Sequence, residues 1–382
     1  MLFRSWTESS GEFWLFGGYG FDGAGEAGWL NDLWRYERAT GYWTWMKGSA
    51  ARNEPGVHGT RDTVDPATVP GARELPATWI DGSGDFWVFG GYGIDGEGSS
   101  GYLGDLWQYD GSTGDWTWKM GAPERDQPGS YGVRGMPAAA NIPGAREDAA
   151  TWTDPSGNFW LFGGQGFGER GRQGRLNDLW KYHPVTENWT WVGGSSTINQ
   201  SGTCGILGIA DPANIPGARY GAVSWIDGAG NLWLFGGRGY DAAGSFGELS
   251  DLWQYDPATG NWTWMKGSPT VNQSGTHGDL GAPDVANNPG ARMRAVSWTG
   301  SAGCLWLSGG KGHDRAGNYG WLNDLWKYDP ATGNWTWVEG KASINQPGIG
   351  GTPGSRSGAV VWTDTSGEIG RASCRERVYC EV

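Results

Sequence analysis

The sequence predicts an all-β protein in which one unit of four antiparallel strands is repeated along the chain. Three motifs recur every 73 residues: an apolar run that ends in Gly-Gly, an Asp-Leu-Trp motif and a Trp-Thr-Trp pair. The apolar runs are anchored, without an insertion or deletion between anchors, at Trp14, Trp87, Trp160, Trp233 and Trp306. A long period with several short strands per copy is typical of a repeat architecture.

The copy at residues 219–267 illustrates the predicted strands. It contains four short runs rich in aromatic and β-branched residues, each bounded by Gly, Pro, Asn or Asp: 222–226, 231–235, 251–256 and 261–265. Runs of this length and composition predict strands. No window has a sustained 3.6-residue apolar period, so we expect no long helix.

Both faces of the predicted sheets carry large rings. In Trp-Thr-Trp the two indoles lie on one face because strand side chains alternate, while Trp and Tyr of the third strand add rings of their own. A sheet covered on both faces fits a blade between two other blades, and radial repetition of such sheets gives a β-propeller. We expect five complete blades and a partial sixth at Trp362, over residues 1–367, which is a truncated ring.

A further pattern points to a known family. Each copy has the Gly-Gly, a Tyr in the third strand and a Trp seven residues later, as at Gly236, Gly237, Tyr255 and Trp262. This trio resembles the kelch repeat over residues 1 to about 366. The resemblance implies a kelch-type propeller, similar to the propeller of galactose oxidase. The repeat is longer than the usual kelch unit of about 50 residues, and the surplus lies between the fourth strand and the next first strand.

The two ends differ from the repeat pattern. Residues 353–367 begin a sixth copy, but residues 368–382 do not continue it and look like translated sequencing-adapter DNA. We therefore expect 368–382 to be a non-native tail, with a natural basic tail as the alternative. The natural protein is then expected to hold at least six units. A secretory signal upstream of Met1 is left open, and among locations we favour secretion or the cell surface.

Composition argues against several classes of partner. The net charge is −13 and no basic stripe is visible, which argues against nucleic-acid binding. No apolar span or basic amphipathic helix suggests membrane insertion. Outside the tail only Cys204 and Cys304 remain, which gives neither a disulfide framework nor a metal-ligand spacing.

The long loops locate the expected binding surface. In a four-stranded meander alternate connections emerge at opposite edges, so the second-to-third loop (237–250) and the connection between copies (266–292) share one edge. Loops on a rigid scaffold commonly carry binding residues. We therefore expect a ligand on this rim.

Four equivalent rim positions in the connections are candidates for the site: His58, Tyr131, Cys204 and His277. Imidazole and soft ligands suit copper, and the resemblance to galactose oxidase implies residues of these types at a copper site. The alternative is one turn position that accepts flat or small polar side chains. Trp29 and Trp321, in second-to-third loops, are candidates for carbohydrate binding, or they pack on neighbouring loops.

Acidic residues of the second-to-third loops suggest calcium as a further alternative. Oxygen-rich glycine loops can bind calcium, but an Asp in a turn commonly caps its own backbone. The residues concerned are Asp22, Asp95, Asp241 and Asp314. The Asp of Asp-Leu-Trp and the Arg before each first strand recur in every copy, so we interpret both as structural, with the Arg as a tie between units.

The resulting prediction is a non-enzymatic interaction module that binds a protein or glycan on the long-loop rim. Near-identical units and the lack of a unique catalytic constellation favour this interpretation, because enzymes on symmetric scaffolds normally break the symmetry at the site. The alternative is a galactose oxidase-like copper oxidoreductase. Apart from copper or calcium in these alternatives, we expect no cofactor.

Overall fold

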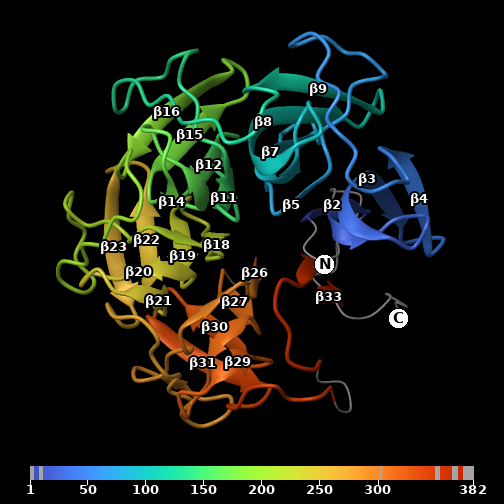
Figure 1. Ribbon diagram of the computed structural model, residues 1–382. Helices are drawn as coiled ribbons and strands as arrows, with labels where there is room; N and C mark the ends of the chain where they lie inside the picture. The colour runs from blue at the N-terminus through green and yellow to red at the C-terminus, as the bar shows by residue number, and fades with distance from the viewer. Residues whose placement is uncertain (1–3, 8–11, 301–302, 349–352, 364–368, 373–382) are drawn as a thin grey trace. The chain divides into compact units, whose positions relative to one another are not determined.

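The computed structural model describes residues 4–7, 12–300, 303–348, 353–363 and 369–372 (Figure 1). These residues form strands and turns without a helix, and therefore include no helix that could cross a membrane. The chain forms two compact parts, an N-terminal part (1–198 with 362–370) and a C-terminal part (199–361 with 371–382). We number the repeats 1 to 5 by their anchoring tryptophans; repeats 1–3 belong to the N-terminal part and repeats 4 and 5 to the C-terminal part.

In repeats 1 and 2 the strands form one antiparallel sheet, and in repeat 3 they form a four-stranded and a three-stranded antiparallel sheet. Repeat 1 contains β1 (Arg4–Thr7), β2 (Phe13–Phe21), β3 (Ala27–Glu37) and β4 (Tyr42–Lys47). Repeat 2 contains β5 (Arg73–Glu74), β6 (Ala77–Ile80), β7 (Phe86–Ile94), β8 (Ser100–Asp110) and β9 (Asp115–Met120). Repeat 3 contains β10 (Arg146–Glu147), β11 (Ala150–Thr153), β12 (Phe159–Phe162), β13 (Gln165–Phe167), β14 (Gln173–Arg175), β15 (Leu179–His183) and β16 (Asn188–Gly193).

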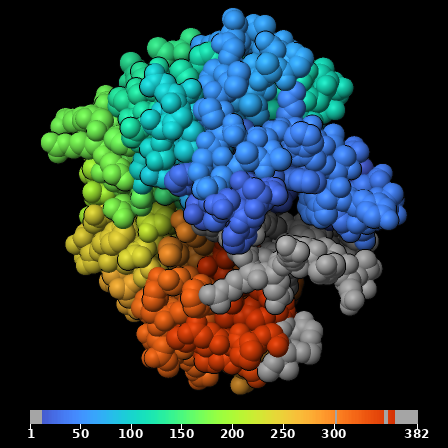
Figure 2. All heavy atoms as spheres, turned by 45° about the vertical axis from the view of Figure 1, so that its right-hand side comes forward, coloured from blue at the N-terminus to red at the C-terminus, as the bar shows by residue number. Residues whose placement is uncertain are grey.

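The C-terminal part follows the same plan. Repeat 4 contains β17 (Arg219–Tyr220), β18 (Val223–Ile226), β19 (Leu232–Phe235), β20 (Arg238–Tyr240), β21 (Phe246–Glu248), β22 (Leu252–Asp256) and β23 (Asn261–Lys266). Repeat 5 contains β24 (Pro283–Asp284), β25 (Arg292–Met293), β26 (Val296–Thr299), β27 (Leu305–Ser308), β28 (Lys311–His313), β29 (Tyr319–Trp321), β30 (Leu325–Asp329) and β31 (Asn334–Glu339). Figure 2 shows the same chain as spheres, with repeat 1 in blue and repeat 5 in orange to red.

These strands confirm the all-β prediction. The four strands expected in residues 219–267 appear as β18, β19, β22 and β23, each within one residue of the expected bounds. The structure adds detail to the second-to-third segment, which was predicted only as a long loop. This segment continues both strands as a two-stranded ribbon, β20 with β21, in which Arg238 lies opposite Glu248.

The start of the sixth copy is also a strand. β32 (Val360–Thr363) contains the predicted anchor Trp362 and pairs with β33 (Ile369–Ala372). Apart from β33, the expected non-native tail at 368–382 lies outside the described residues.

Within each part the sheets pack on one another through aromatic rings. The ring of Phe16 in repeat 1 lies 5.2 Å from that of Trp116 in repeat 2, and Phe235 in repeat 4 lies 5.6 Å from Trp335 in repeat 5. Trp116, Trp189 and Trp335 of the fourth strands are fully buried. In repeats 2, 3 and 5 the fourth strand is therefore covered by the second strand of the preceding repeat, and this contact forms the core of each part.

The Arg that was predicted to tie neighbouring repeats forms a buried ion pair within its own repeat. Arg73 donates two hydrogen bonds to Asp105, at 2.6 and 2.9 Å. The same pairing, 32 residues apart, joins Arg146 to Asp178, Arg219 to Asp251 and Arg292 to Asp324. All four guanidinium groups are buried. A buried ion pair needs this bidentate geometry to offset desolvation, so the spacing of the two motifs is fixed by structure.

Candidate binding surface

A glycine pair creates the ribbon that carries the candidate surface. Gly17 and Gly18 have φ angles of 58° and 100°, and the pairing of β2 with β3 shifts register between Phe16 and Gly18. A Cβ on Gly17 would lie 2.8 Å from the carbonyl oxygens of Arg73 and Leu30. Only glycine tolerates both the backbone angle and the close approach. The strands therefore continue past a bulge, and their far halves project as the ribbon.

The connection between repeats fixes the base of each ribbon. Asn53 has a φ of 59°, and its backbone N–H donates to the carbonyl oxygen of Trp29. The N–H of Trp29 in turn donates to Asn53 Oδ1 at 3.0 Å. Asp126 makes the same two bonds to Tyr102. The two long loops thus lie side by side, as the meander topology predicts.

Five aromatic rings form a continuous row across the ribbons of repeats 1–3. We call Tyr19, Trp29, Tyr92, Tyr102 and Phe167 the aromatic row. Successive ring centroids are 5.8, 5.5, 5.0 and 5.9 Å apart. Tyr19 is 43% exposed, and Phe21 beside the row is 67% exposed. Since three ribbons contribute, the row exists only when the repeats are packed.

Polar groups hold the row in place. The indole N–H of Trp29 donates to Glu74 Oε1 at 3.1 Å. The hydroxyl of Tyr102 accepts hydrogen bonds from the amide groups of Gln165 and Gln173, at 2.6 and 2.8 Å, and burial raises the pKa of Tyr102. The row is therefore rigid and uncharged.

The ribbons of the C-terminal part carry a more charged surface. Tyr319 donates its hydroxyl to Glu248 at 2.9 Å, and burial together with this carboxylate raises the pKa of Tyr319 to about 12. The ammonium of Lys311 lies 5.5 Å from the ring of Trp321 and 5.2 Å from that of Tyr319. Trp321 is 39% exposed, but Lys311 occupies one of its ring faces.

At three of the four equivalent rim positions the side chain lies against the carboxylate of the next copy of Asp-Leu-Trp. His58 Nε2 lies 3.1 Å from Asp105 Oδ2, and His277 Nε2 lies 3.4 Å from Asp324 Oδ2. The hydroxyl of Tyr131 donates to Asp178 at 2.6 Å. His58, Tyr131 and His277 each also pack on two indoles, those of the Asp-Leu-Trp and Trp-Thr-Trp motifs. Each of these three side chains therefore packs against the aspartate of its own Arg–Asp ion pair.

Cys204 occupies the same position in the C-terminal part. Burial, with a smaller contribution from Asp251, raises the pKa of its thiol to about 11. Thiolate is the reactive form, so we expect iodoacetamide at pH 8 to label Cys204 on the order of 100-fold more slowly than an unperturbed cysteine. Peptide mapping by mass spectrometry over a time course measures this rate, with an unfolded sample in urea as the control. Rapid labelling of the folded protein would contradict the raised pKa of this half-buried thiol.

The aspartates suggested for calcium cap their own loops instead. Asp22 Oδ1 accepts from the backbone N–H groups of Ala24 and Glu26, each at 2.9 Å, and Oδ2 accepts from Arg52 N–H. Asp95, Asp241 and Asp314 make the same three contacts. Among the described residues no group of three His, Cys, Asp or Glu side chains could hold a metal ion.

Sequence reasoning singled out Trp29 but missed Tyr19, Tyr92, Tyr102 and Phe167. A signal was present in the residue that follows each Gly-Gly, which reads Tyr, Tyr, Gln, Arg and Lys in repeats 1 to 5. Variation at one position within an otherwise constant frame indicates a surface that differs from repeat to repeat.

No model of a known protein family matches the chain, and no curated protein matches it.

Proposed function

We propose that the chain is a non-enzymatic binding module that takes a protein or glycan on the ribbon surface, and that the aromatic row favours an uncharged glycan chain. The observation that supports this most is the row itself, five rings in contact across three repeats with its Tyr19 end exposed. Aromatic side chains give a large, rigid contact area, and a few placed polar groups set the orientation of a ligand.

The net charge of the protein argues against acidic ligands. At a net charge of −13 the chain repels acidic polysaccharides. The exposed Tyr19 end of the row offers an aromatic ring and a hydroxyl group, which suit the C–H faces and hydroxyl groups of neutral sugars.

A neutral-glycan array, followed by calorimetric titration of any hit, tests this proposal. Trp29→Ala and Tyr19→Ala are each expected to weaken binding about 10-fold or more, because each removes one ring of the row, and Tyr19 is its exposed end. Tyr42→Ala is the matched control, since Tyr42 is 73% exposed but lies on β4, away from the ribbons. No neutral glycan bound, or equal loss in all three variants, would contradict the glycan assignment.

The architecture that goes with this function is a kelch-type propeller. The support is the five-fold recurrence of Gly-Gly, Tyr and Trp at constant spacing, together with an antiparallel sheet of sequential strands in each repeat.

The alternative proposal is the copper oxidoreductase. It requires rim residues to share one ion, whereas His58, Tyr131 and His277 each face the carboxylate of a different ion pair. Metal analysis of the purified protein distinguishes the two proposals, because only the oxidoreductase expects stoichiometric copper.

A further inference from the structure

The ties between neighbouring repeats follow one pattern, which Arg292 illustrates in the C-terminal part. Its backbone binds the preceding repeat, since its N–H donates to Leu249 and its carbonyl oxygen accepts from Gly237. Its side chain binds its own repeat, through Asp324 at 2.6 and 2.8 Å and Gly309 O at 2.9 Å. The hydrogen bonds of one arginine therefore involve two neighbouring repeats.

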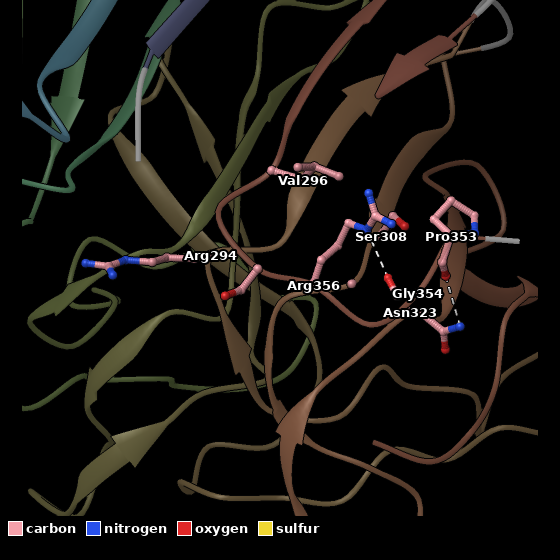
Figure 3. A pocket seen from close by; sticks show the side chains of 10 residues that line it. Arg294, Val296, Ser308, Asn323, Pro353, Gly354 and Arg356 are labelled. Carbon is pink, nitrogen blue, oxygen red and sulfur yellow. Dashed lines mark hydrogen bonds between the residues drawn. The ribbon is translucent and has the colours of Figure 1, made fainter. Parts of the chain in front are cut away.

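Arg356 makes only the first half of this pattern. Its N–H donates to Leu322, and its carbonyl oxygen accepts from Gly310. Its Nε donates to Gly354 O at 2.9 Å (Figure 3), as Arg292 Nε does to Gly290 O. Within the described ranges no carboxylate pairs with Arg356. The guanidinium of Arg356 thus has the same backbone and Nε contacts as Arg292, but no aspartate among the described residues accepts its other hydrogen bonds.

A small hollow lies beside Arg356. It has a volume of about 20 Å³, room for about one water molecule, and its lining includes Ser308, Asn323 and Pro353 (Figure 3). At the position of Ser308 the other four repeats carry Phe, which in repeats 1, 2 and 4 packs on the fourth-strand Trp of the next repeat. We call Arg356 with these hollow-lining residues the trailing face.

Repeat 1 shows the opposite half of the pattern. Asp32 stands at the position of Asp105 and accepts a hydrogen bond from Trp34 Nε1 at 2.6 Å. No basic side chain in the described part of the chain pairs with it. Burial raises the pKa of Asp32, although the bond from Trp34 partly offsets this. An acceptor is therefore in place without its arginine.

The strand beside Asp32 is uncovered as well. Trp43 is 41% and Trp45 52% exposed, whereas Trp116, at the position of Trp43 in repeat 2, is fully buried. In repeats 2–5 the connection from the preceding repeat also binds the fourth strand, as where Asn141 Nδ2 donates to Trp189 O. We call Asp32 with Tyr42, Trp43 and Trp45 of β4 the leading face.

We propose that the trailing face of one copy of the chain binds the leading face of a second copy, with Arg356 of the first donating to Asp32 of the second. Two features of the chain indicate that the binding partner is a second copy. First, the charges are complementary, because Arg356 and Asp32 stand at the two positions that form the buried Arg–Asp ion pair in repeats 2–5. The contact also continues the interface that joins neighbouring repeats within each part, in which Ser308 takes the place of Phe and faces Trp43. Such a head-to-tail contact is heterologous.

The register identifies the docking segment. In the second copy, β1 already occupies the first-strand position beside β2, with Trp6 opposite Trp14. The first strand of the sixth repeat in the incoming copy, β32, therefore does not have to pair with β2. The segment that docks is 353–357, which holds Arg356 and corresponds to the residues that precede each first strand.

Analytical ultracentrifugation of the full chain over a 100-fold range of protein concentration tests the proposal. We expect the mean mass to rise with concentration. Asp32→Asn and Arg356→Gln should each weaken the association about 30-fold or more, since truncating one partner of a buried charge pair leaves the other unpaired. Glu26→Gln and Arg125→Gln make the same changes in charge on exposed side chains away from both faces, and should leave the association unchanged.

Two gain-of-function variants distinguish this contact from a general loss of folding. The double exchange Asp32→Arg with Arg356→Asp restores the pair with reversed polarity and should recover most of the association. Ser308→Phe supplies the ring found in the other repeats and should tighten the association at least about 10-fold. A monomeric mass at every concentration, or an association that is indifferent to Asp32→Asn and Arg356→Gln, overturns the proposal.

Discussion

Asp105→Asn is expected to lower the free energy of unfolding of the N-terminal part by about 3–5 kcal/mol, because it leaves Arg73 buried without a counter-charge. Asp105 accepts two hydrogen bonds from Arg73 and one from the indole of Trp107, and faces His58. An amide cannot accept two charge-assisted bonds from a guanidinium. Urea denaturation followed by tryptophan fluorescence measures the loss.

Asp32→Asn is the matched control, because Asp32 occupies the same repeat position. It has no arginine among the described residues, so the amide removes a buried charge without stranding another. We expect a change of no more than about 1 kcal/mol, in the stabilising direction, at concentrations where the chain is monomeric. Equal losses in the two variants would show that the ion pair contributes nothing beyond the shape of the side chain.

The two aspartates also differ in the expected effect of pH. Burial alone would raise the pKa of Asp105, but Arg73 and His58 hold it well below its usual range. The stabilisation is therefore present above the ordinary carboxyl pKa and is lost as the pH falls toward the folded value. The pKa of Asp32 is raised, so its charged form destabilises the fold at neutral pH, and this cost disappears as the pH falls. The loss in Asp105→Asn should consequently shrink in acid.

Trp116→Ala is expected to destabilise the N-terminal part by about 3–5 kcal/mol, since it empties a fully buried site between repeats 1 and 2. The indole contacts the rings of Phe16 and Tyr109, at 5.2 Å each, and belongs to the cluster that joins both sheets. Chemical denaturation of the variant measures the loss.

Trp43→Ala provides the comparison at the same motif position. Trp43 contacts Tyr36 of its own repeat at 5.1 Å and is 41% exposed. We expect a loss of about 1 kcal/mol or less in the monomer, because exposed substitutions change stability little. A loss as large as that of Trp116→Ala would mean that the indole stabilises its own sheet and not the contact between repeats.

Part of the candidate surface could be predicted from the sequence. The sequence indicated the rim, because strand order alone sends both long loops to one edge, and it indicated Trp29. It did not indicate the aromatic row, since Tyr19, Tyr92 and Phe167 belong to three repeats and become neighbours only when the ribbons pack. It offered copper as an alternative at His58, Tyr131, Cys204 and His277, because these residues occupy equivalent positions along the chain. In the folded chain His58, Tyr131 and His277 each face their own aspartate.

The sequence by itself determined the repeat, the four main strands of each copy and the structural nature of the Arg and Asp motifs. These depend on side-chain alternation and turn residues over a few positions, and on a period that is exact. Only the tertiary structure decided which residues pair across longer separations. Arg73 meets Asp105 across 32 residues and Phe16 meets Trp116 across 100, because the packing of one sheet on the next sets the register. It also decided that Asp32 and Arg356 lack partners among the described residues, since a missing partner is visible only where the remaining contacts are already in place.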